Sequence, residues 1–315
     1  MIKALNGRET YIKHLLISNA GMRSQLLVVV ICVISTIVIA SSFYWFTQNT
    51  NEQPVRPGDY HATLMFEGYA RSYDLHVPPQ YDGKTPLPLV FALHSFGSDA
   101  ATFANVTGFN KEADANGFFV VYPQGLDNSW NAGTCCRPSS QQVFNDSGFI
   151  KTLLVKLKSD LAVNDSRVYA AGLSNGGMLA YRLACDDSED FAAIAPVAAT
   201  SVVESCNATG PVSVFAVHGT ADEAVPYNNS TRSASALPVP PAVDAVFSWA
   251  QRDGTVSVPR QQVEGNLTVT TYGRGANGTE VVLYTLNGGT HVWPTKIPTT
   301  DLIWRFFELH PRQSA

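Results

Sequence analysis

The stretch from Arg167 to Arg182 constrains the fold more than any other part of the chain. A short β-prone run, 168–173, ends at Ser174, and apolar residues at helical spacing follow it. The centre of the stretch, Gly172-Leu-Ser-Asn-Gly176, matches the pattern G-x-S-x-G. A strand-to-helix turn this tight admits only glycine two positions either side of the central residue, which it holds strained above the sheet. The pattern therefore predicts a nucleophile elbow with Ser174 as the nucleophile.

An uncharged apolar run at 26–46 is long enough to cross a bilayer, because a helix rises about 1.5 Å per residue and the hydrocarbon core is ~30 Å thick. Basic residues precede the run, so the positive-inside rule leaves residues 1–25 as a cytosolic tail and exports everything after 46. The length favours a retained signal anchor, although Val38-Ile-Ala40 before Ser41 also suits cleavage of a signal peptide. We expect an extracellular domain, membrane-anchored or secreted, that meets the membrane through this segment only.

Residues 47–59 are polar and contain Pro54 and Pro57, which predicts a linker to one catalytic domain at 60–315. With 45% hydrophobic residues, that domain can bury a single large core. The net charge is −5 and no basic stripe is present, which argues against a nucleic-acid partner. We expect a monomer.

Cysteines and glycosylation sequons both bear on the expected export. Four cysteines follow the apolar run, and an even set suits disulfides in an oxidising compartment, with three possible connectivities. Asn-x-Ser/Thr sequons, which carry glycans in eukaryotic hosts, begin at Asn105, Asn145, Asn164, Asn207, Asn228, Asn229, Asn266 and Asn277.

Strands and helices are expected to alternate through the exported region. Apolar runs predict strands at 61–67, 71–77, 87–93, 118–122, 168–173, 193–197, 212–218, 267–272 and 281–286. Helical spacing predicts helices at 109–116, 149–161, after Ser174, and at 241–249 and 301–309, with a long irregular loop at 125–145. This alternation predicts an α/β sandwich with a mostly parallel sheet flanked by helices.

The segment 273–278 matches the G-x-G-x-x-G spacing of a dinucleotide site. Such a site needs a helix to begin there, whereas the residues that follow it, 281–285, are predicted to be a strand. We therefore interpret the segment as a hairpin turn.

A serine nucleophile needs a base to take its proton, and in elbow hydrolases the acid and then the base follow the serine along the chain. His291 lies in a glycine-rich loop after a predicted strand, where its side chain can lean over the sheet. His218 ends a buried strand with no loop before the following acid, and His310 is expected at the surface of the last helix. We therefore predict His291 as the base.

Asp222 is the predicted acid, because it lies in the turn after the 212–218 strand, within reach of such a histidine. Glu223 is its nearest competitor, and Asp186, Asp187 and Asp244 lie on or beside helices.

Two backbone N–H groups should hold the oxyanion of the tetrahedral intermediate. Asn175 follows the nucleophile and should supply one, and the turn after the 87–93 strand should supply the other, from Phe96. His94 precedes the nucleophile and breaks the expected order, so we interpret it as a residue that braces this turn.

Trp130 and Trp293 are candidates to line a substrate pocket, although Trp293 suits packing equally well. No group of His, Cys or Asp shows metal-ligand spacing, so we expect no metal site.

With these residues assembled, the region from about 60 to 310 resembles the secreted esterase group that includes polyhydroxybutyrate depolymerases and feruloyl and acetylxylan esterases. The motifs that carry the resemblance are Leu93-His-Ser-Phe-Gly97, Ser129-Trp-Asn-Ala-Gly-Thr-Cys-Cys136, Gly172-Leu-Ser-Asn-Gly-Gly-Met178, His218-Gly-Thr-Ala-Asp222 and His291-Val-Trp-Pro294. The resemblance implies an α/β-hydrolase fold, cofactor-free ester hydrolysis, and a triad at Ser174, Asp222 and His291.

The resemblance also implies a disulfide between Cys185 and Cys206, and leaves the state of Cys135 and Cys136 open. The chain departs from the family pattern in two places. Ser95 stands where glycine is usual, which bears on the oxyanion turn, and Asn145-Asp146 stands where paired aspartates are frequent.

These observations predict an exported serine carboxylic-ester hydrolase that works through an acyl-enzyme. Feruloyl or acetyl esters of plant cell-wall polysaccharide are favoured over poly(3-hydroxybutyrate), because the sequence shows no separate polymer-binding domain and exported members of the group often act on such esters. A serine peptidase is an alternative, although such enzymes commonly add a gating domain for which no residues are spare. A non-catalytic adhesion protein should lack a triad member, and none is missing.

Overall fold

A computed structural model describes residues 34–36, 55–136, 144–231, 237–255 and 258–313. The predicted cytosolic tail, nearly all of the predicted membrane segment and most of the predicted linker lie outside these ranges. Within them, no helix combines the length and the apolar character needed to cross a membrane. Residues from Val55 onward form one compact unit.

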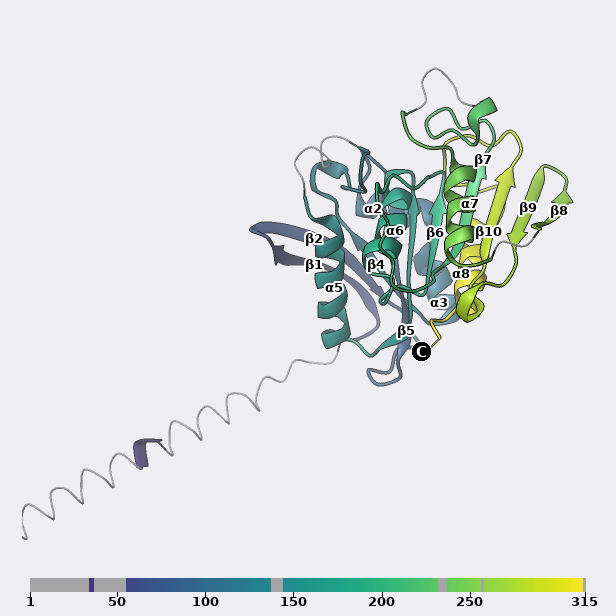
Figure 1. The fold of residues 1–315 in the computed structure, drawn as a ribbon. Coiled ribbons are helices and arrows are strands. Elements are labelled where there is room, and N and C mark those ends of the chain that lie inside the picture. The colour runs from purple at the N-terminus through teal and green to yellow at the C-terminus, as the bar shows by residue number, and fades with distance from the viewer. Residues whose placement is uncertain (1–33, 37–54, 137–143, 232–236, 256–257, 314–315) are drawn as a thin grey trace, which may run out of the picture. The chain divides into compact units, whose positions relative to one another are not determined.

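The described residues build one ten-stranded sheet in the order β1-β2-β4-β3-β5-β6-β7-β10-β9-β8 (Figure 1). The strands are β1 (Gly58–Phe66), β2 (Tyr69–Val77), β3 (Leu87–Leu93), β4 (Phe119–Pro123), β5 (Val163–Leu173), β6 (Ala193–Val197), β7 (Ser213–Gly219), β8 (Arg260–Glu264), β9 (Leu267–Tyr272) and β10 (Val281–Leu286). In this order the central strands β4, β3, β5, β6, β7 and β10 are parallel to one another. Antiparallel pairing flanks them on both sides, through β2 and β1 at one edge and β9 and β8 at the other. Every residue of β4, β6 and β7 is buried, as expected for apolar runs covered on both faces. The predicted mostly parallel sheet is confirmed.

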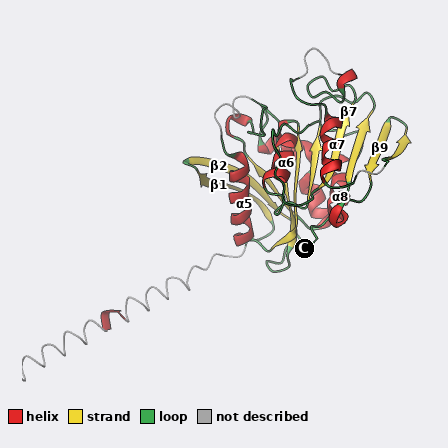
Figure 2. Ribbon diagram, viewed as in Figure 1, coloured by secondary structure: helices red, strands yellow, loops and turns green. Residues whose placement is uncertain are grey.

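Helices cover both faces of this sheet, which Figure 2 shows as red coils around yellow strands. The helices are α2 (Ala100–Thr107), α3 (Phe109–Asn116), α5 (Asp146–Asp160), α6 (Asn175–Asp186), α7 (Ala242–Arg252) and α8 (Thr299–Leu309), with short 3-10 turns at Leu126–Asn128, Asn229–Thr231 and Ala276–Gly278. Residues of α5, α6 and α7 belong to one apolar core, and residues of α2, α3 and α8 belong to a second core on the other face. The result is a three-layer α/β/α arrangement.

Two elements were not predicted from the sequence. Helix α2 is short, but Asp99 caps it by accepting a hydrogen bond from the Thr102 N–H, and Gly108 ends it in a left-handed conformation. Strand β8 is exposed along its whole length, so it has no apolar alternation and depends on hairpin pairing with β9. The cap signals at 99 and 108 were present in the sequence, whereas β8 gave no local signal.

The segment 273–278 connects β9 to β10, which pair antiparallel. A 3-10 turn and then a strand follow its first glycine, so no helix opens there to meet a pyrophosphate. The interpretation of this segment as a hairpin connection is confirmed.

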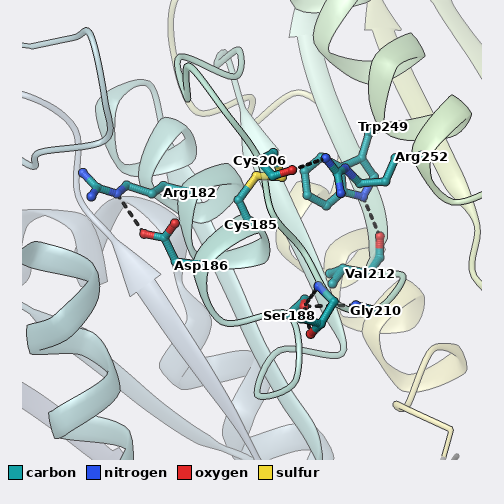
Figure 3. The surroundings of a disulfide bond; sticks show 10 residues. Arg182, Cys185, Asp186, Ser188, Cys206, Gly210, Val212, Trp249 and Arg252 are labelled. Carbon is teal, nitrogen blue, oxygen red and sulfur yellow. Dashed lines mark hydrogen bonds and ion pairs between the residues drawn. A yellow bond between two sulfur atoms is a disulfide. The ribbon is translucent and has the colours of Figure 1, made fainter.

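A disulfide joins Cys185, near the end of α6, to Cys206 in the connection between β6 and β7 (Figure 3). The Arg252 guanidinium of α7 donates to the Cys206 carbonyl at 2.6 Å, and the Trp249 indole donates to the Val212 carbonyl at 2.8 Å. The disulfide therefore anchors a connection that α7 also holds. Cys135 and Cys136 are bonded to each other.

Replacing Cys185 and Cys206 together by Ala should lower the free energy of unfolding by about 3 kcal/mol, because the closed loop spans a separation of 21 residues. Urea unfolding of the variant and of the wild type measures the difference. In a thiol reductant, the unfolding free energy of the wild type should approach that of the variant. A urea midpoint that changes neither in the variant nor on reduction of the wild type would contradict a stabilising disulfide.

Asp253, directly after α7, is a buried carboxylic acid with 1% of its surface exposed. Neither of its carboxyl oxygens has a hydrogen-bond partner among the described residues. Burial raises the pKa of this carboxyl from 3.8 to about 7. The folded state therefore favours the protonated acid, whereas the unfolded chain ionises near its ordinary value.

Because the folded pKa of Asp253 is raised, its protonated form stabilises the fold at low pH, and this contribution is lost as the pH rises from about 4 to about 7. The loss should reach about 4 kcal/mol. Asp253→Asn should remove it, so this variant should gain stability relative to wild type between pH 4 and pH 8 in urea unfolding. Parallel stability curves for the two proteins would show that Asp253 does not titrate in this range.

Candidate active site

The residues predicted from the three turn positions lie together at one edge of the sheet. Ser174 follows β5, Asp222 lies three residues after β7, and His291 lies five residues after β10. These strands run parallel, so their carboxyl ends share the edge where the three side chains meet.

A continuous hydrogen-bonded chain links the three side chains. The Nδ1 atom of His291 lies 2.8 Å from Oδ2 and 3.0 Å from Oδ1 of Asp222. Its Nε2 atom lies 2.9 Å from Ser174 Oγ. A carboxylate only accepts hydrogen bonds, which assigns the imidazole proton to Nδ1 and leaves Nε2 to accept from the serine hydroxyl.

Ser174 has φ 54° and ψ −118°, a strained conformation for a residue with a side chain. The turn is held against the end of β3, since a Cβ atom on Gly176 would overlap the carbonyl oxygens of Leu93 and His94. Only glycine fits this position, as the G-x-S-x-G pattern requires. The elbow thus lies directly beside the turn that follows β3.

The turns that carry Asp222 and His291 also touch each other. A Cβ atom on Gly219 would overlap the Gly289 carbonyl, and the Ala221 N–H donates to that same carbonyl at 2.9 Å. Asp222 is buried, and its Oδ1 atom accepts from the Ala224 and Val225 N–H groups at 2.9 and 2.8 Å. These bonds hold the carboxylate in the orientation that meets His291.

His94 braces the turn after β3, as its sequence position indicated. The fully buried ring donates from Nδ1 to the Ser95 carbonyl at 2.9 Å, and its Nε2 atom accepts from the Gly125 N–H at 2.9 Å. Burial lowers the pKa of His94 to about 4, so the ring is neutral near pH 7. Phe96 lies in the same turn, with 52% of its surface exposed.

Trp130 was predicted to line a substrate pocket, and this is wrong. Its side chain has no exposed surface, and its indole N–H donates to the His94 carbonyl at 2.8 Å. Its backbone N–H donates to Oδ1 of Asn175 at 2.7 Å, while Asn175 Nδ2 donates to the Trp130 carbonyl at 3.0 Å. Trp130 therefore joins the loop after β4 to both the elbow and the turn after β3.

Trp293 also belongs to the core, with 5% of its surface exposed. Its ring meets Phe103 and Phe109 edge-on, with centroids 5.5 and 6.0 Å apart. The packing alternative therefore holds for Trp293, and this packing anchors the segment directly after His291 to α2 and α3.

A buried ion pair supports the Trp130 segment from the other side. Arg71 donates to Asp146 Oδ1 at 2.7 Å, and the Asn131 N–H donates to Asp146 Oδ2 at 2.7 Å. Both charged side chains are buried, and the Arg71 guanidinium lies 3.9 Å from the Phe149 ring centroid. Burial raises the pKa of the Asp146 carboxyl, and the charge of Arg71 opposes this shift. This ion pair was not predicted from the sequence, whose one signal here was the departure from the family pattern at Asn145-Asp146.

His310 lies apart from this arrangement, at the end of α8. His310 was predicted at the surface, but only 9% of its side chain is exposed, because it lies against Phe306 and 3.4 Å from Glu280. Within the described ranges, no group of three or more His, Cys, Asp or Glu side chains is arranged to hold a metal ion.

The sheet order, the strained serine after β5 and the Ser-His-Asp geometry are those of an α/β-hydrolase. A model of the family described as "Esterase PHB depolymerase" matches residues 71–265. The match covers more than half of the 315 residues, so the chain belongs to this esterase family. It is therefore an enzyme of the serine-esterase type.

Relatives and solved structures agree with the family. The chain is 29% identical over 256 residues to the putative esterase NocK of Nocardia uniformis subsp. tsuyamanensis, covering 73% of both chains. It is 27% identical over 226 residues to feruloyl esterase B of Piromyces equi, covering 68% of this chain and 41% of that protein. Identity to the bifunctional acetylxylan esterase/xylanase XynS20E of Neocallimastix patriciarum is 28%, over 74% of this chain and 32% of that protein.

The chain thus spans less than half the length of the last two relatives. Among solved structures, acetyl xylan esterase from Aspergillus awamori matches with a TM-score of 0.62 at 16% identity, covering 80% of this chain and 99% of that chain. At this identity the likeness shows the shared fold.

Asp146→Asn should lower the free energy of unfolding by about 3–5 kcal/mol, because it leaves the buried Arg71 charge without its partner. The double variant Arg71→Met/Asp146→Asn should recover much of this loss, since no charge is then buried and Asn can still accept from the Asn131 N–H. Urea unfolding of the single and double variants measures both effects. A double variant no more stable than Asp146→Asn would contradict the ion-pair account.

Proposed function

We propose that this protein is a serine carboxylic-ester hydrolase with Ser174 as the nucleophile, His291 as the general base and Asp222 as the acid that orients the base. The observation that carries the proposal is the unbroken chain from Ser174 Oγ to His291 Nε2, at 2.9 Å, and from His291 Nδ1 to Asp222 Oδ2, at 2.8 Å. Both distances suit proton transfer and tautomer control.

In the first half-reaction, Ser174 Oγ attacks the ester carbonyl carbon while its proton passes to His291 Nε2. The imidazolium that forms is stabilised by the buried Asp222 carboxylate 2.8 Å away. The tetrahedral intermediate then collapses, the bond to the alcohol oxygen breaks, and the departing alcohol takes the proton from Nε2. The acyl group remains as an ester of Ser174.

The oxyanion of the intermediate is assigned to the backbone N–H groups of Asn175 and Phe96. Asn175 is the first residue of α6, and the first N–H groups of a helix have no partner within it. The turn that holds Phe96 follows Leu93 and His94, whose carbonyls contact the elbow at Gly176. This contact supports the two donors facing one position beside Ser174 Oγ.

Water completes the cycle by the reverse route. It attacks the acyl carbon while His291 takes one of its protons, and the second tetrahedral intermediate expels Ser174 Oγ. The proton on Nε2 returns to that oxygen as the carboxylic acid leaves. No other group on the chain needs to gain or lose a proton.

For the ester itself, we propose feruloyl or acetyl groups on plant cell-wall polysaccharide. The names of feruloyl esterase B and of the acetylxylan esterase/xylanase support this class. Phe96 and Val292 each expose 52% of their surface. Phe96 lies in the turn after β3, and Val292 directly follows His291 in the sequence. Such apolar surface suits a phenolic acyl group. Poly(3-hydroxybutyrate) is the second candidate, because the family description names its depolymerase.

We also propose that the catalytic domain works outside the cytosol, either anchored through residues 26–46 or released by cleavage. The two disulfides support this location, since such bonds persist in oxidising compartments. The sequon residues Asn266 and Asn277 lie exposed at turns, where an oligosaccharide can be attached in a eukaryotic host.

Ser174→Ala should abolish hydrolysis of p-nitrophenyl acetate, because no other group takes the nucleophile's position, and should leave the melting temperature close to that of wild type. The loss in kcat/KM should be at least about 10³-fold. The same variant should no longer be labelled by a fluorophosphonate probe. Ser205→Ala, which alters an exposed serine in another loop, serves as the matched control.

Methyl ferulate, acetylated xylan and poly(3-hydroxybutyrate) tested side by side on wild type and Ser174→Ala separate the candidate esters. Turnover of only the polyester would transfer the substrate assignment to the second candidate. Turnover of a peptide panel in place of esters, or activity of Ser174→Ala near that of wild type, would refute the proposed hydrolase.

A further inference from the structure

His218 is a buried histidine that the proposed mechanism does not use. It lies in β7, four residues before Asp222, and 2% of its surface is exposed. Its Nε2 atom lies 3.0 Å from the Val225 carbonyl oxygen and 3.6 Å from Asp222 Oδ2. Since a carbonyl only accepts, Nε2 carries the proton and donates it to Val225.

This bond closes the loop that surrounds the Asp222 carboxylate. The Val225 N–H donates to Asp222 Oδ1 at 2.8 Å, and the Ala224 N–H donates to the same oxygen at 2.9 Å. The Val225 N–H therefore binds the Asp222 carboxylate, while the Val225 carbonyl accepts a hydrogen bond from His218. If the carbonyl were released, the loop would lose this side-chain contact with β7.

The strand that leads to His291 supports His218 in turn. Thr285 of β10 lies opposite His218 in the parallel register, and its hydroxyl lies 3.0 Å from the Tyr227 hydroxyl. The Tyr227 ring lies nearly parallel to the His218 ring, with centroids 6.1 Å apart. The position of His218 is therefore set by the two strands that carry the proposed acid and base.

A neutral donor suits this place better than a charged one. Burial lowers the pKa of His218, and the charge of Asp222 opposes this, while His291 favours the neutral form. The Nδ1 atom has no hydrogen-bond partner among the described residues, as expected for the unprotonated nitrogen of a neutral ring. A cation here would compete with the His291 imidazolium for the Asp222 carboxylate.

We propose that His218 is a positioning residue that holds the 222–225 loop through its bond to the Val225 carbonyl and so keeps the Asp222 carboxylate aimed at His291 Nδ1. The assignment rests on the proposed function, because it acts through the Asp222–His291 pair. It touches neither the ester nor the reacting atoms.

The test compares His218→Met, which keeps the volume but removes the donor, with His218→Gln, whose amide nitrogen extends to about the position of Nε2. His218→Asn is a second variant without the bond, since its shorter amide does not reach Val225. The kcat and KM values for p-nitrophenyl acetate are measured from pH 5 to pH 9, and the melting temperature of each variant is recorded beside them.

His218→Met and His218→Asn should lose at least about tenfold in kcat with KM within about twofold, because a misplaced carboxylate stabilises the imidazolium less. The acid limb of the kcat/KM profile should move to lower pH, since the Asp222 charge then favours protonated His291 less. His218→Gln should keep most of the wild-type kcat and an acid limb close to that of wild type. A residue with only a structural role would change the melting temperature without moving the pH profile.

Wild-type kcat and pH profile in His218→Met or His218→Asn would overturn the assignment. Equal losses in the Gln, Asn and Met variants would overturn it too, because the donated hydrogen bond would then be irrelevant. Ser174→Ala is measured in parallel. Its inactivity beside a fully active His218→Met would reject the positioning role alone, whereas an active Ser174→Ala would reject the proposed function and this role with it.

Discussion

The hydrogen bond between the Asp222 carboxylate and the His291 imidazole is the interaction on which the rest of the site depends. The two residues are 69 positions apart, and they meet because β7 and β10 are parallel neighbours whose carboxyl ends share an edge. The close contact between Gly219 and Gly289 sets the distance between their turns. Without the carboxylate, neither the tautomer nor the orientation of the imidazole toward Ser174 would be determined.

The nucleophile's side of the site is built separately, from buried polar groups that are hydrogen-bonded to one another. Asn175 and Trp130 exchange two hydrogen bonds, and the Trp130 indole reaches the carbonyl of His94. Beneath them, Asp146 holds the next residue of the loop and balances the buried charge of Arg71. Such a network is rigid because each bond that is broken leaves an unsatisfied polar group away from water. It therefore supports the strained conformation at Ser174.

The fold and the proposed machinery do not select an ester. Hydrolases of this architecture differ in the loops above a common sheet edge, so specificity depends on side chains outside the triad. Both tryptophans that were candidates for the pocket belong to the core, whereas Phe96 and Val292 are exposed apolar residues beside the site. Substrate preference is thus assigned to surface loops, while the buried tryptophans assemble the site.

The amino-acid sequence by itself determined the elbow, the parallel character of the sheet, and Ser174, Asp222 and His291 as the residues that meet at its edge. Each of these has a local signal, since each side chain lies in the turn or loop that follows a predicted strand. Strand β8 has no such signal, because it is exposed and exists only through pairing with β9. Only the tertiary structure decided that Trp130 is buried and that His218 faces Val225. Burial and hydrogen-bond partners depend on segments distant along the chain, which no local pattern of residues encodes.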